Sequence, residues 1–417
     1  MINYTKNRPS AIKFYTLGCK ANQYDTQSIR EKFLNSGFQE INNGKKADVY
    51  LINTCTVTHR ADSDSLNLIR RAKRENSKAK IIVTGCLTEL DSHKIKQISK
   101  NITLVKNRDK KNILKCFPAY SLQLTTYSLN GISSFAGHTR AFLKIQDGCD
   151  NFCSYCKVPL VRGRSRSRPK EEIISEAKRL VVNGFKEIVL TGICLGAYRD
   201  LVGLIEKLEK IPGLLRIRLS SIEAGDISDE LIEKIAKSDK ICRHLHIPIQ
   251  SGDNEILKKM NRKYSRDDYL NLIKEIKRKI PQIAITTDCL VGFPSESEES
   301  FRNTLDLVKK IMPLKVHIFP YSARPTTAAA GFKEKVKIEV IKERIKRLEK
   351  LADSCSLQYR KKFSGKIMPV LIEGQVKNKL DFWQGYTDNY IKVILKSRAD
   401  LKNCIQSIRL TKADLAS

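Results

Sequence analysis

The chain has 417 residues, a length that favours two or three domains, and 41% of them are hydrophobic, enough for several ordinary cores. No run approaches the roughly 20 consecutive apolar residues of a membrane span, and the N-terminus shows no apolar signal core. We therefore expect no membrane association and a cytoplasmic location. Lysine and arginine total 77 against 45 acidic residues. The net charge of +32 favours a nucleic-acid partner over the alternative, a merely solvated basic surface.

Strand and helix signals alternate over residues 10–116, which predicts an N-terminal α/β domain with a parallel sheet. Three predicted strands, IKFYTLGC, ADVYLINTC and KIIVTGC, end in Cys19, Cys55 and Cys86, and ITLVKN is a fourth strand. Because open parallel sheets bind ligands at the carboxyl ends of their strands, we expect these cysteines to converge at one edge. A shared metal centre is favoured over the alternative, three buried core cysteines.

The rest of the chain is predicted to contain a linker, a barrel and a small β module. Residues 117–134 lack clear periodicity and are predicted as the linker. Over residues 135–363, six strand signals alternate with helix signals, which predicts a partial (β/α)6 barrel, open at the side as a macromolecular substrate requires. Residues 364–414 predict a small β-barrel of the kind that binds oligonucleotides. Its aromatic residues, the single tryptophan included, either stack on bases or fill a core.

The stretch GCDNFCSYC follows the first predicted barrel strand and spaces Cys149, Cys153 and Cys156 as C-x3-C-x2-C. In a cytoplasmic protein, twelve cysteines favour metal binding over disulfides. Structural zinc is the rival interpretation, but zinc sites of this kind are closed by four ligands, and no nearby residue completes the set. Three thiolates can hold three irons of a 4Fe–4S cluster, which leaves the fourth iron open to a small chelating ligand.

This spacing, followed by a β/α series, resembles the radical S-adenosylmethionine enzymes. The resemblance implies that the methionine end of the cofactor chelates the open iron, and that its cleavage gives a radical that abstracts hydrogen from an unreactive carbon. It also implies a cofactor pocket at the carboxyl face of the barrel, although each residue assigned to it has an alternative role in a turn or cap. The residues assigned by analogy are Tyr155 beside the adenine, Thr191 and Gly192 at the methionine amine, Ser220 and Glu223 at the ribose, and Gln250 and Asp288 facing the same cavity.

Nearly the whole chain resembles the methylthiotransferases, which combine an N-terminal domain of this kind, a radical core and a C-terminal TRAM module that binds RNA. The resemblance implies a second 4Fe–4S cluster at Cys19, Cys55 and Cys86 that presents the sulfur to be inserted. GCKANQY and GRSRSR are most similar to the branch that modifies threonylcarbamoyladenosine in tRNA. That branch inserts a methylthio group at carbon 2 of the nucleoside, next to the anticodon at tRNA position 37. The implied partners are tRNA, a reducing electron donor and a sulfur donor.

Other functions stay open at this point. Within the family, the substrate is alternatively isopentenyladenosine in tRNA or an aspartate of a ribosomal protein. A non-catalytic iron–sulfur protein that binds RNA is an alternative of another class, and the predicted cofactor pocket counts against it. The sequence departs from the family pattern at Leu160, where an aromatic residue is common, at Cys194, which replaces a polar residue, and at Ser295, which replaces a glycine. None of these is a predicted cluster ligand, but Cys194 is expected near the cofactor.

An arginine-rich run follows the second cysteine triplet. Arg162, Arg164, Arg166 and Arg168 alternate along GRSRSR and its preceding residue. In an extended segment, alternate side chains point to one side, which would give a row of donors suited to RNA phosphates. The alternative is that these arginines pair within the protein and hold the loop in place.

Overall fold

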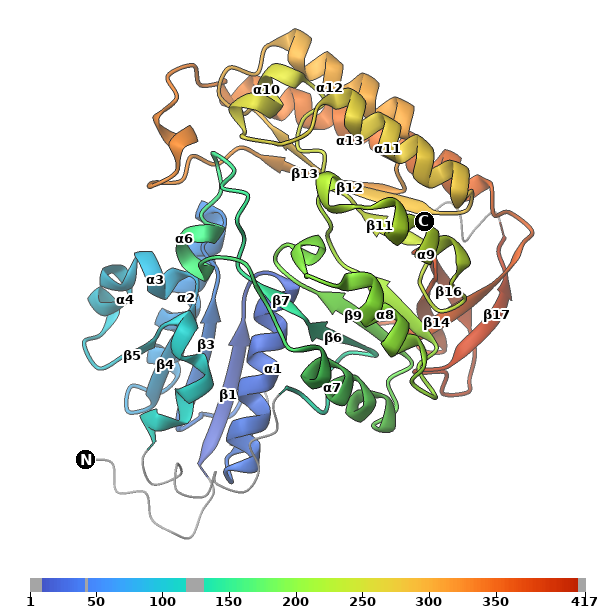
Figure 1. Cartoon of the computed structure of the whole chain (residues 1–417). Helices are drawn as coiled ribbons and strands as arrows, with labels where there is room; N and C mark the ends of the chain where they lie inside the picture. The colour runs from blue at the N-terminus through green and yellow to red at the C-terminus, as the bar shows by residue number, and fades with distance from the viewer. Residues whose placement is uncertain (1–9, 42–43, 118–130, 412–417) are drawn as a thin grey trace. The chain divides into compact units, whose positions relative to one another are not determined.

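The computed structural model describes residues 10–41, 44–117 and 131–411 (Figure 1). Most of the predicted linker therefore lies outside the described residues. Contacts divide the chain into two compact units, each of which is described by itself. Unit 1 comprises Met1–Ala136, Asp147–Asp150 and Cys156–Arg166, and unit 2 comprises Gly137–Gln146, Asn151–Tyr155 and Ser167–Ser417. The predicted three-part division stays a prediction.

Unit 1 is built on a five-stranded sheet whose strands are all parallel, in the order β2-β1-β3-β4-β5. This confirms the predicted parallel α/β fold, to which the structure adds the short edge strand β2. The strands are β1 (Ala11–Thr16), β2 (Gln39–Glu40), β3 (Val49–Thr54), β4 (Lys80–Gly85) and β5 (Thr103–Val105). The helices are α1 (Lys20–Asn35), α2 (His59–Glu75), α3 (Leu87–Leu90), α4 (Ser92–Ile98) and the 3-10 helix η1 (Asn107–Cys116).

The sheet of unit 1 is covered on both faces, which explains why its central strands are continuously apolar. Every residue of β3 is buried. Val49 and Leu51 pack with Phe33 of α1 in one hydrophobic core. Tyr50 packs in a second core, which contains Ile69 of α2. The helices lie over the sheet and leave the carboxyl ends of the strands as the edge where loops gather (Figure 1).

Unit 2 contains six parallel strands, which confirms the predicted number of β/α repeats. They are β6 (Arg140–Lys144), β9 (Glu187–Thr191), β10 (Arg216–Leu219), β11 (His244–His246), β12 (Ala284–Val291) and β13 (Lys315–Pro320). They form two three-stranded sheets, β10-β9-β6 and β11-β12-β13, joined by parallel bridges from Ile217 to Ile241 and from Ser221 to His246.

Helices connect these strands and cover their outer face (Figure 1). They are α7 (Lys170–Val182), α8 (Leu201–Glu209), α9 (Asp229–Lys237), α10 (Asn254–Lys259), α11 (Arg266–Lys279), α12 (Glu298–Ile311) and α13 (Ile338–Lys361), with short 3-10 turns η3 (Leu195–Ala197), η4 (Ala224–Asp226) and η5 (Ala328–Gly331). The short elements β7 (Gln146–Asp147), α6 (Val158–Arg162) and β8 (Arg166–Ser167) flank the second cysteine triplet. Polar caps start several helices, as when Ser265 and Asp268 form a reciprocal capping box at α11.

The C-terminal module is an antiparallel sheet in the order β16-β15-β14-β17. Its strands are β14 (Ile367–Gln375), β15 (Phe382–Thr387), β16 (Lys392–Lys396) and β17 (Ile405–Arg409). The second of these strands, β15, contains Trp383. Trp383 is 6% exposed, shares a core with Tyr359 and Phe363, and donates from Nε1 to the Ser397 carbonyl at 3.1 Å. The tryptophan therefore fills a core, one of the two roles open to it from the sequence.

Buried charges join the C-terminal module to the amino ends of the barrel strands. Glu187, at the start of β9, is 1% exposed and accepts a hydrogen bond from Arg218 Nε at 2.7 Å. Arg216 donates to the Pro369 carbonyl at 2.6 Å, and Arg218 donates to the Asp388 carbonyl at 2.9 Å. The module is thus held at the end of the strands opposite to their carboxyl ends. Among the described residues, no helix is both long enough and apolar enough to cross a membrane.

Candidate functional site

The structure places the three N-terminal cysteines at the carboxyl ends of adjacent parallel strands, as predicted. Cys55 directly follows β3 and Cys86 directly follows β4, whereas Cys19 precedes the first turn of α1 after β1. Cys55 and Cys86 are buried and Cys19 is exposed. Cys55 and Cys86 therefore form the buried side of the three-cysteine set, and Cys19 forms the side that a ligand can reach.

Two glycines keep the backbone close around these cysteines. Gly18 has a φ of +96°, and a Cβ atom there would lie 2.9 Å from both Cβ and Sγ of Cys55. Gly85 has a φ of +100°, and its Cβ would lie 2.3 Å from the Thr54 carbonyl oxygen. A larger residue would suffer both an unfavourable backbone conformation and a clash. The glycines thus leave room for the cysteine sulfurs at the sheet edge.

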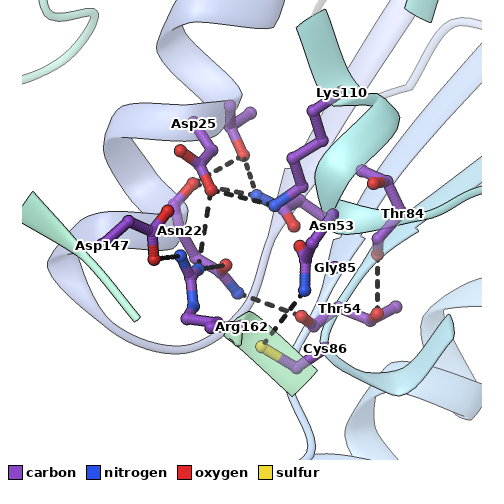
Figure 2. A network of polar contacts seen from close by, with 12 residues as sticks. Asn22, Asp25, Asn53, Thr54, Thr84, Gly85, Cys86, Lys110, Asp147 and Arg162 are labelled. Carbon is purple, nitrogen blue, oxygen red and sulfur yellow. Dashed lines mark hydrogen bonds and ion pairs between the residues drawn. The ribbon is translucent and has the colours of Figure 1, made fainter. Parts of the chain in front are cut away.

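An asparagine pair fixes the loops that carry the cysteines. Asn22 donates from Nδ2 to the carbonyls of Leu17 at 2.7 Å and Thr54 at 3.0 Å. Asn53 donates from Nδ2 to the Asn22 carbonyl at 2.9 Å. These contacts tie the ends of β1 and β3 together, and Figure 2 shows them beside Cys86.

Burial and neighbouring charge both disfavour a thiolate at Cys55. Burial is the largest cause of a pKa raised to about 11, the charges of Cys86 and Cys19 act in the same direction, and the backbone amides of Val57 and Thr56 oppose them. Without a bound cation Cys55 is therefore a neutral thiol at neutral pH, because forming the thiolate carries a free-energy penalty. A metal centre removes this penalty, because a coordinated thiol is deprotonated by the charge of the metal. The donor set and the glycine-lined backbone fit an iron–sulfur cluster.

The second triplet lies on one continuous loop between β7 and α6. In unit 1, the Cys149 amide donates to the Gly163 carbonyl at 3.1 Å, and the Val158 amide donates to Cys156 Sγ at 3.4 Å. Gly148 has a φ of +77°, and a Cβ there would lie 2.0 Å from the Arg164 carbonyl oxygen. The loop is thus held by backbone contacts, and an N–H group already points at a sulfur that a cluster would use.

In unit 2, Cys153 has a cationic partner that the sequence analysis did not identify. Arg262 donates from Nη1 to Cys153 Sγ at 3.3 Å and forms an ion pair with Glu223. Its guanidinium also donates to the Tyr264 hydroxyl, from Nη2 at 2.9 Å. Arg262 lies in the turn after α10 and belongs to no motif that would have singled it out. It connects a predicted cluster ligand to Glu223, which was predicted to contact the ribose.

The predicted cofactor residues of unit 2 gather at the carboxyl ends of its strands. Thr191 ends β9, and the following loop is ordered by Gln146, whose Oε1 accepts the amides of Ile193 and Cys194, both at 2.9 Å. A Cβ at Gly192 would lie 2.9 Å from the same Oε1, so only glycine fits there. Gln146 was not predicted, because a strand-end glutamine has no distinctive spacing.

The hydroxyl and carboxyl groups of this pocket differ in how well each could bind a ligand. Thr191 donates to the Val189 carbonyl at 3.1 Å, so its hydroxyl is already engaged. Ser220 is 5% exposed, and its Oγ has no hydrogen-bond partner within the described part of the chain. Burial raises the pKa of Glu223, and the adjacent Arg262 opposes that rise. Ser220 and Glu223 are therefore better suited than Thr191 to contact a ligand.

Two further predicted pocket residues, Tyr155 and Gln250, differ in their surroundings. Tyr155 meets Phe293 edge to face at 6.4 Å and packs on an apolar cluster that includes Met260. Gln250 has a φ of +61° in the left-handed region, and its backbone bridges to Cys289. A non-glycine residue in that conformation is strained, which is typical of functional sites.

Asp288 belongs to a group that the sequence did not predict. His246 Nε2 lies 3.2 Å from Asp288 Oδ1, and His246 Nδ1 lies 2.9 Å from Thr286 Oγ1. With His317, these side chains place three potential ligand atoms within 4.8 Å of one another, the one such group in the described ranges. The cysteines do not converge in this way, and a cluster does not require it, since each thiolate binds a different iron. His246 on β11 and His317 on β13 flank Asp288 on the central strand β12, a juxtaposition without sequence spacing to reveal it.

Cys194 lies next to the second cysteine loop, in agreement with its expected proximity to the cofactor. Asn151 Nδ2 lies 3.8 Å from Cys194 Sγ, and that thiol donates to Asp226 Oδ2 at 3.1 Å. Cys194 is buried, so it orders the pocket wall and does not face bulk solvent.

The arginine run does not form one continuous extended row. The side chain of Arg162 is 3% exposed and bonded to Asp147 at 2.8 Å, and Arg168 is bonded to Glu176 at 2.7 Å. The side chain of Arg164 is 73% exposed, with a surface contact to Asp150 at 3.3 Å. Arg166 donates from Nη2 to the Arg162 carbonyl at 3.1 Å. All four arginines therefore pair within the protein, as in the alternative left open by the sequence, although Arg164 and Arg166 do so at the surface.

Comparison with known proteins agrees with this geometry. Residues 143–308 match the Radical SAM superfamily, and residues 11–106 match the uncharacterized protein family UPF0004. The chain is 39% identical to the threonylcarbamoyladenosine tRNA methylthiotransferase MtaB of Bacillus subtilis, over 97% of this chain and 94% of that protein. It is 42% identical to MtaB of Chlamydia pneumoniae, over 88% of each chain. It is also 35% identical to the tRNA-2-methylthio-N(6)-dimethylallyladenosine synthase of Carboxydothermus hydrogenoformans, over 96% of each chain.

Among solved structures, the fold is similar to that of the radical S-adenosylmethionine methyltransferase TsrM from Kitasatospora setae. The TM-score is 0.58 and the identity 13%, with 77% of each chain covered. At that identity the likeness concerns the fold alone.

Proposed function

The chain belongs to the methylthiotransferase family of radical S-adenosylmethionine enzymes, and on that premise we propose that it acts on tRNA. Its substrate in this proposal is N6-threonylcarbamoyladenosine next to the anticodon, which it converts into the 2-methylthio form. The observation that carries the proposal is the near full-length match to two relatives named for this reaction. The position of both cysteine triplets supports the same reaction.

The radical S-adenosylmethionine family uses an iron–sulfur cluster and S-adenosylmethionine, which together supply hydrogen abstraction from an unreactive carbon when bound. Cys149, Cys153 and Cys156 are the proposed ligands of that cluster. The Val158 amide and the Arg262 guanidinium are aimed at two of these sulfurs, where N–H donors stabilise thiolate ligands. Arg262 thereby orients both the cluster loop and Glu223.

S-adenosylmethionine is proposed to bind at the carboxyl ends of β9 to β12. The Gln146 side chain holds the loop after Thr191 so that the backbone at Gly192 lies open to the methionine end. Ser220 supplies a buried hydroxyl and Glu223 a buried carboxylate for the ribose. Tyr155, Gln250 and Asp288 complete the proposed wall, on the predictions made from the sequence. Closing this pocket against water protects a radical from side reactions.

A second 4Fe–4S cluster is proposed at Cys19, Cys55 and Cys86, where it presents the sulfur to be transferred. Three observations support it: the cysteines follow adjacent strands, Gly18 keeps the space beside Cys55 free, and the charges of Cys86 and Cys19 act on the Cys55 thiol. A reducing electron donor and a sulfur donor are the further partners that this chemistry requires. A tRNA substrate implies a cytoplasmic enzyme.

Binding of tRNA is proposed to use the basic surface and not the aromatic residues of the C-terminal module. Trp383 is buried, and Tyr390 stacks between His244 and Tyr386 at ring distances of 4.7 and 5.1 Å. Exposed arginines remain near the second cysteine loop, among them Arg164. With a net charge of +32, phosphate contacts are the main source of affinity in this proposal.

The second candidate is the same reaction on isopentenyladenosine in tRNA, because relatives named for the dimethylallyladenosine product match at 35% identity over nearly the whole chain. Mass spectrometry of tRNA nucleosides from cells with and without the gene separates the two. We expect only 2-methylthio-threonylcarbamoyladenosine to disappear. Loss of the isopentenyl product instead would change the substrate and leave the reaction unchanged. If every tRNA nucleoside were unaffected, ribosomal proteins would be analysed for modified aspartate.

The division of labour between the triplets is tested with single cysteine variants of the reconstituted protein. Cys153→Ala should abolish cleavage of S-adenosylmethionine under reducing conditions. Cys55→Ala should leave cleavage intact and remove sulfur insertion. Equal loss of cleavage in two folded variants would contradict the two-cluster assignment, and absence of cleavage in the parent protein would favour a non-catalytic RNA-binding role.

A further inference from the structure

Arg162 is the centre of a buried charge network in unit 1 (Figure 2). Its Nη1 atom donates to Asp147 Oδ1 at 2.8 Å, and its Nη2 atom lies 3.5 Å from Asp25 Oδ2. Lys110 of η1 donates to the same Asp25 oxygen at 2.9 Å. Two cations therefore face two carboxylates, of which Asp25 is buried and Asp147 is partly exposed.

The network joins segments that carry both cysteine triplets. Arg162 also donates to the side-chain oxygen of Asn22, in the helix that begins after Cys19. Asp147 stands just before Cys149, and Arg162 ends the short helix that follows Cys156. One guanidinium with several donors in a fixed fork can hold both segments at once. A change at Arg162 would release the two cysteine-bearing loops from each other.

The same network reaches the sulfur of Cys86. Burial raises the pKa of the Cys86 thiol, whereas the positive charges of Arg162 and Lys110 and a hydrogen bond from Arg162 act in the opposite direction. Asn107 Nδ2 also lies 4.0 Å from Cys86 Sγ and donates to the Val161 carbonyl at 2.7 Å. Asn107 thus bridges the Cys86 sulfur and the residue before Arg162, which places the Arg162 guanidinium beside the loop of this thiol (Figure 2).

We propose that Arg162 is a positioning residue for the cluster at Cys19, Cys55 and Cys86, and that with Lys110 it raises the reduction potential of that cluster. The inference rests on the second cluster of the proposed function. A cluster gains negative charge on reduction, so a buried cation beside it stabilises the reduced state. The potential of such clusters is set by nearby charge, by hydrogen bonds to sulfur and by solvent exposure, and Arg162 contributes a buried positive charge.

The test uses the full chain with Cys149→Ala, Cys153→Ala and Cys156→Ala, so that the N-terminal cysteines alone can hold a cluster. After anaerobic reconstitution, iron and sulfide are counted and the cluster is titrated by electron paramagnetic resonance. Arg162→Gln should shift the potential to more negative values. Asp147→Asn, which removes an anion from the same network, should shift it to more positive values. Arg162→Lys should restore most of the parent potential.

Arg164→Gln is the matched control, because Arg164 lies in the same loop but is 73% exposed and pairs with Asp150 at the surface. Its potential should equal that of the parent. Equal potentials in Arg162→Gln and Arg164→Gln would overturn the proposal, as would a shift of the same sign in Arg162→Gln and Asp147→Asn. If the parent with three alanines held no cluster, the second cluster itself would fail, which is a different result from a cluster insensitive to Arg162.

Should Arg162→Gln prevent cluster assembly, the opposite shift in Asp147→Asn decides the question, because Asp147 is partly exposed and its replacement is better tolerated. An unchanged potential in Asp147→Asn would then overturn the electrostatic role. Recovery of the cluster in Arg162→Lys would support it, since lysine keeps the charge but not the fork of donors.

Discussion

The molecule contains two buried charge clusters that are built around arginine. One lies at the carboxyl ends of parallel strands and the other at the amino ends. In unit 1, Arg162 and its neighbours lie at the carboxyl edge of the parallel sheet, beside Cys86. In unit 2, Arg140, Arg216 and Arg218 surround Glu187 at the amino ends of the barrel strands. Both clusters remove arginine from water, a costly step unless each charge finds partners.

The partners of the two clusters differ. At Glu187, the arginines also bind groups other than this carboxylate. Arg216 and Arg218 donate to carbonyls of the C-terminal module, and the Tyr390 ring lies 4.6 Å from the Arg218 guanidinium carbon. At Arg162, two cations and two carboxylates balance, and the neighbouring atoms are thiols suited to a metal centre. The first cluster holds two modules of one unit together, whereas the second is placed to influence chemistry. Burial of an arginine therefore does not reveal its role until its neighbours are known.

The largest expected effect is on stability, from Glu187→Ala. Removing this carboxylate leaves three arginines facing one another in a buried site, and breaking such a network costs about 3–5 kcal/mol. Chemical denaturation measures the decrease, with Glu206→Ala as the exposed control, expected within about 0.5 kcal/mol of the parent. Cluster content should not change. A decrease at Glu187 no greater than in the control would show that the cluster is not structural.

A smaller decrease in stability is expected from Asp25→Asn in the other cluster. Lys110 and Arg162 lose the carboxylate that they share, and Arg162 keeps Asp147, so the cost should be about 1.5–3 kcal/mol, typical of a hydrogen bond to a charged group. In contrast to Glu187→Ala, this change should also move the potential of the proposed N-terminal cluster to more positive values. Electron paramagnetic resonance titration checks the shift. An unaltered potential would make the two clusters alike in being purely structural.

Acid should weaken the Glu187 cluster in a defined direction. Burial by itself would raise the pKa of Glu187, but the charges of Arg218, Arg140 and Arg216 outweigh it and hold the pKa below its usual value of 4.5. The folded-state pKa is thus depressed, so the stabilisation is complete above the unfolded pKa and is lost as the pH falls through the folded pKa. Unfolding measured between neutral pH and pH values below 4.5 should show this decrease in the parent chain. Glu187→Gln should be less stable at neutral pH and nearly flat over the acidic part of the range.

The smallest expected effect concerns the exposed arginines that belong to neither cluster. Arg164→Gln with Arg166→Gln should leave the free energy of unfolding within about 0.5 kcal/mol of the parent, because both side chains lie at the surface. Affinity for tRNA should fall modestly. For each phosphate that the variant no longer binds, the slope of log affinity against log salt should shrink by roughly 0.7–0.9. Filter binding at several salt concentrations measures it, and an unchanged slope would exclude these arginines from the tRNA interface.

The two triplets show how much of a site a sequence can predict. Cys149, Cys153 and Cys156 are close in the chain, so their spacing is a local signal that points directly to a cluster. The N-terminal cysteines are far apart in sequence, yet each follows a strand, and the rule for parallel sheets was enough to bring them to one edge. The six repeats of the barrel were predictable for a similar reason, because strand signals alternate with helix signals along this part of the chain.

Other parts of the site required the three-dimensional structure. Arg262 meets Cys153, and His246 meets Asp288, through contacts between strands or turns that no spacing records. An extended row was one of the two interpretations of the arginine run, but a short helix and Gly163 break it, so Arg162 turns inward while Arg164 faces solvent. Side-chain direction there depends on where buried carboxylates from distant segments lie.

The sequence by itself determined the chemistry of this protein: two sets of thiols, the order of strands and helices that carry them, and the family to which they belong. Those features are local. The type of metal-binding side chain, the hydrophobic period and the order of the elements can each be identified from a short segment of the sequence. Tertiary structure alone decided which charges became buried, which aromatic residues filled a core, and where the C-terminal sheet attached to the barrel. The physical reason is that burial and pairing are properties of neighbours brought together from far along the chain, and the cost of burying a charge is set by those neighbours.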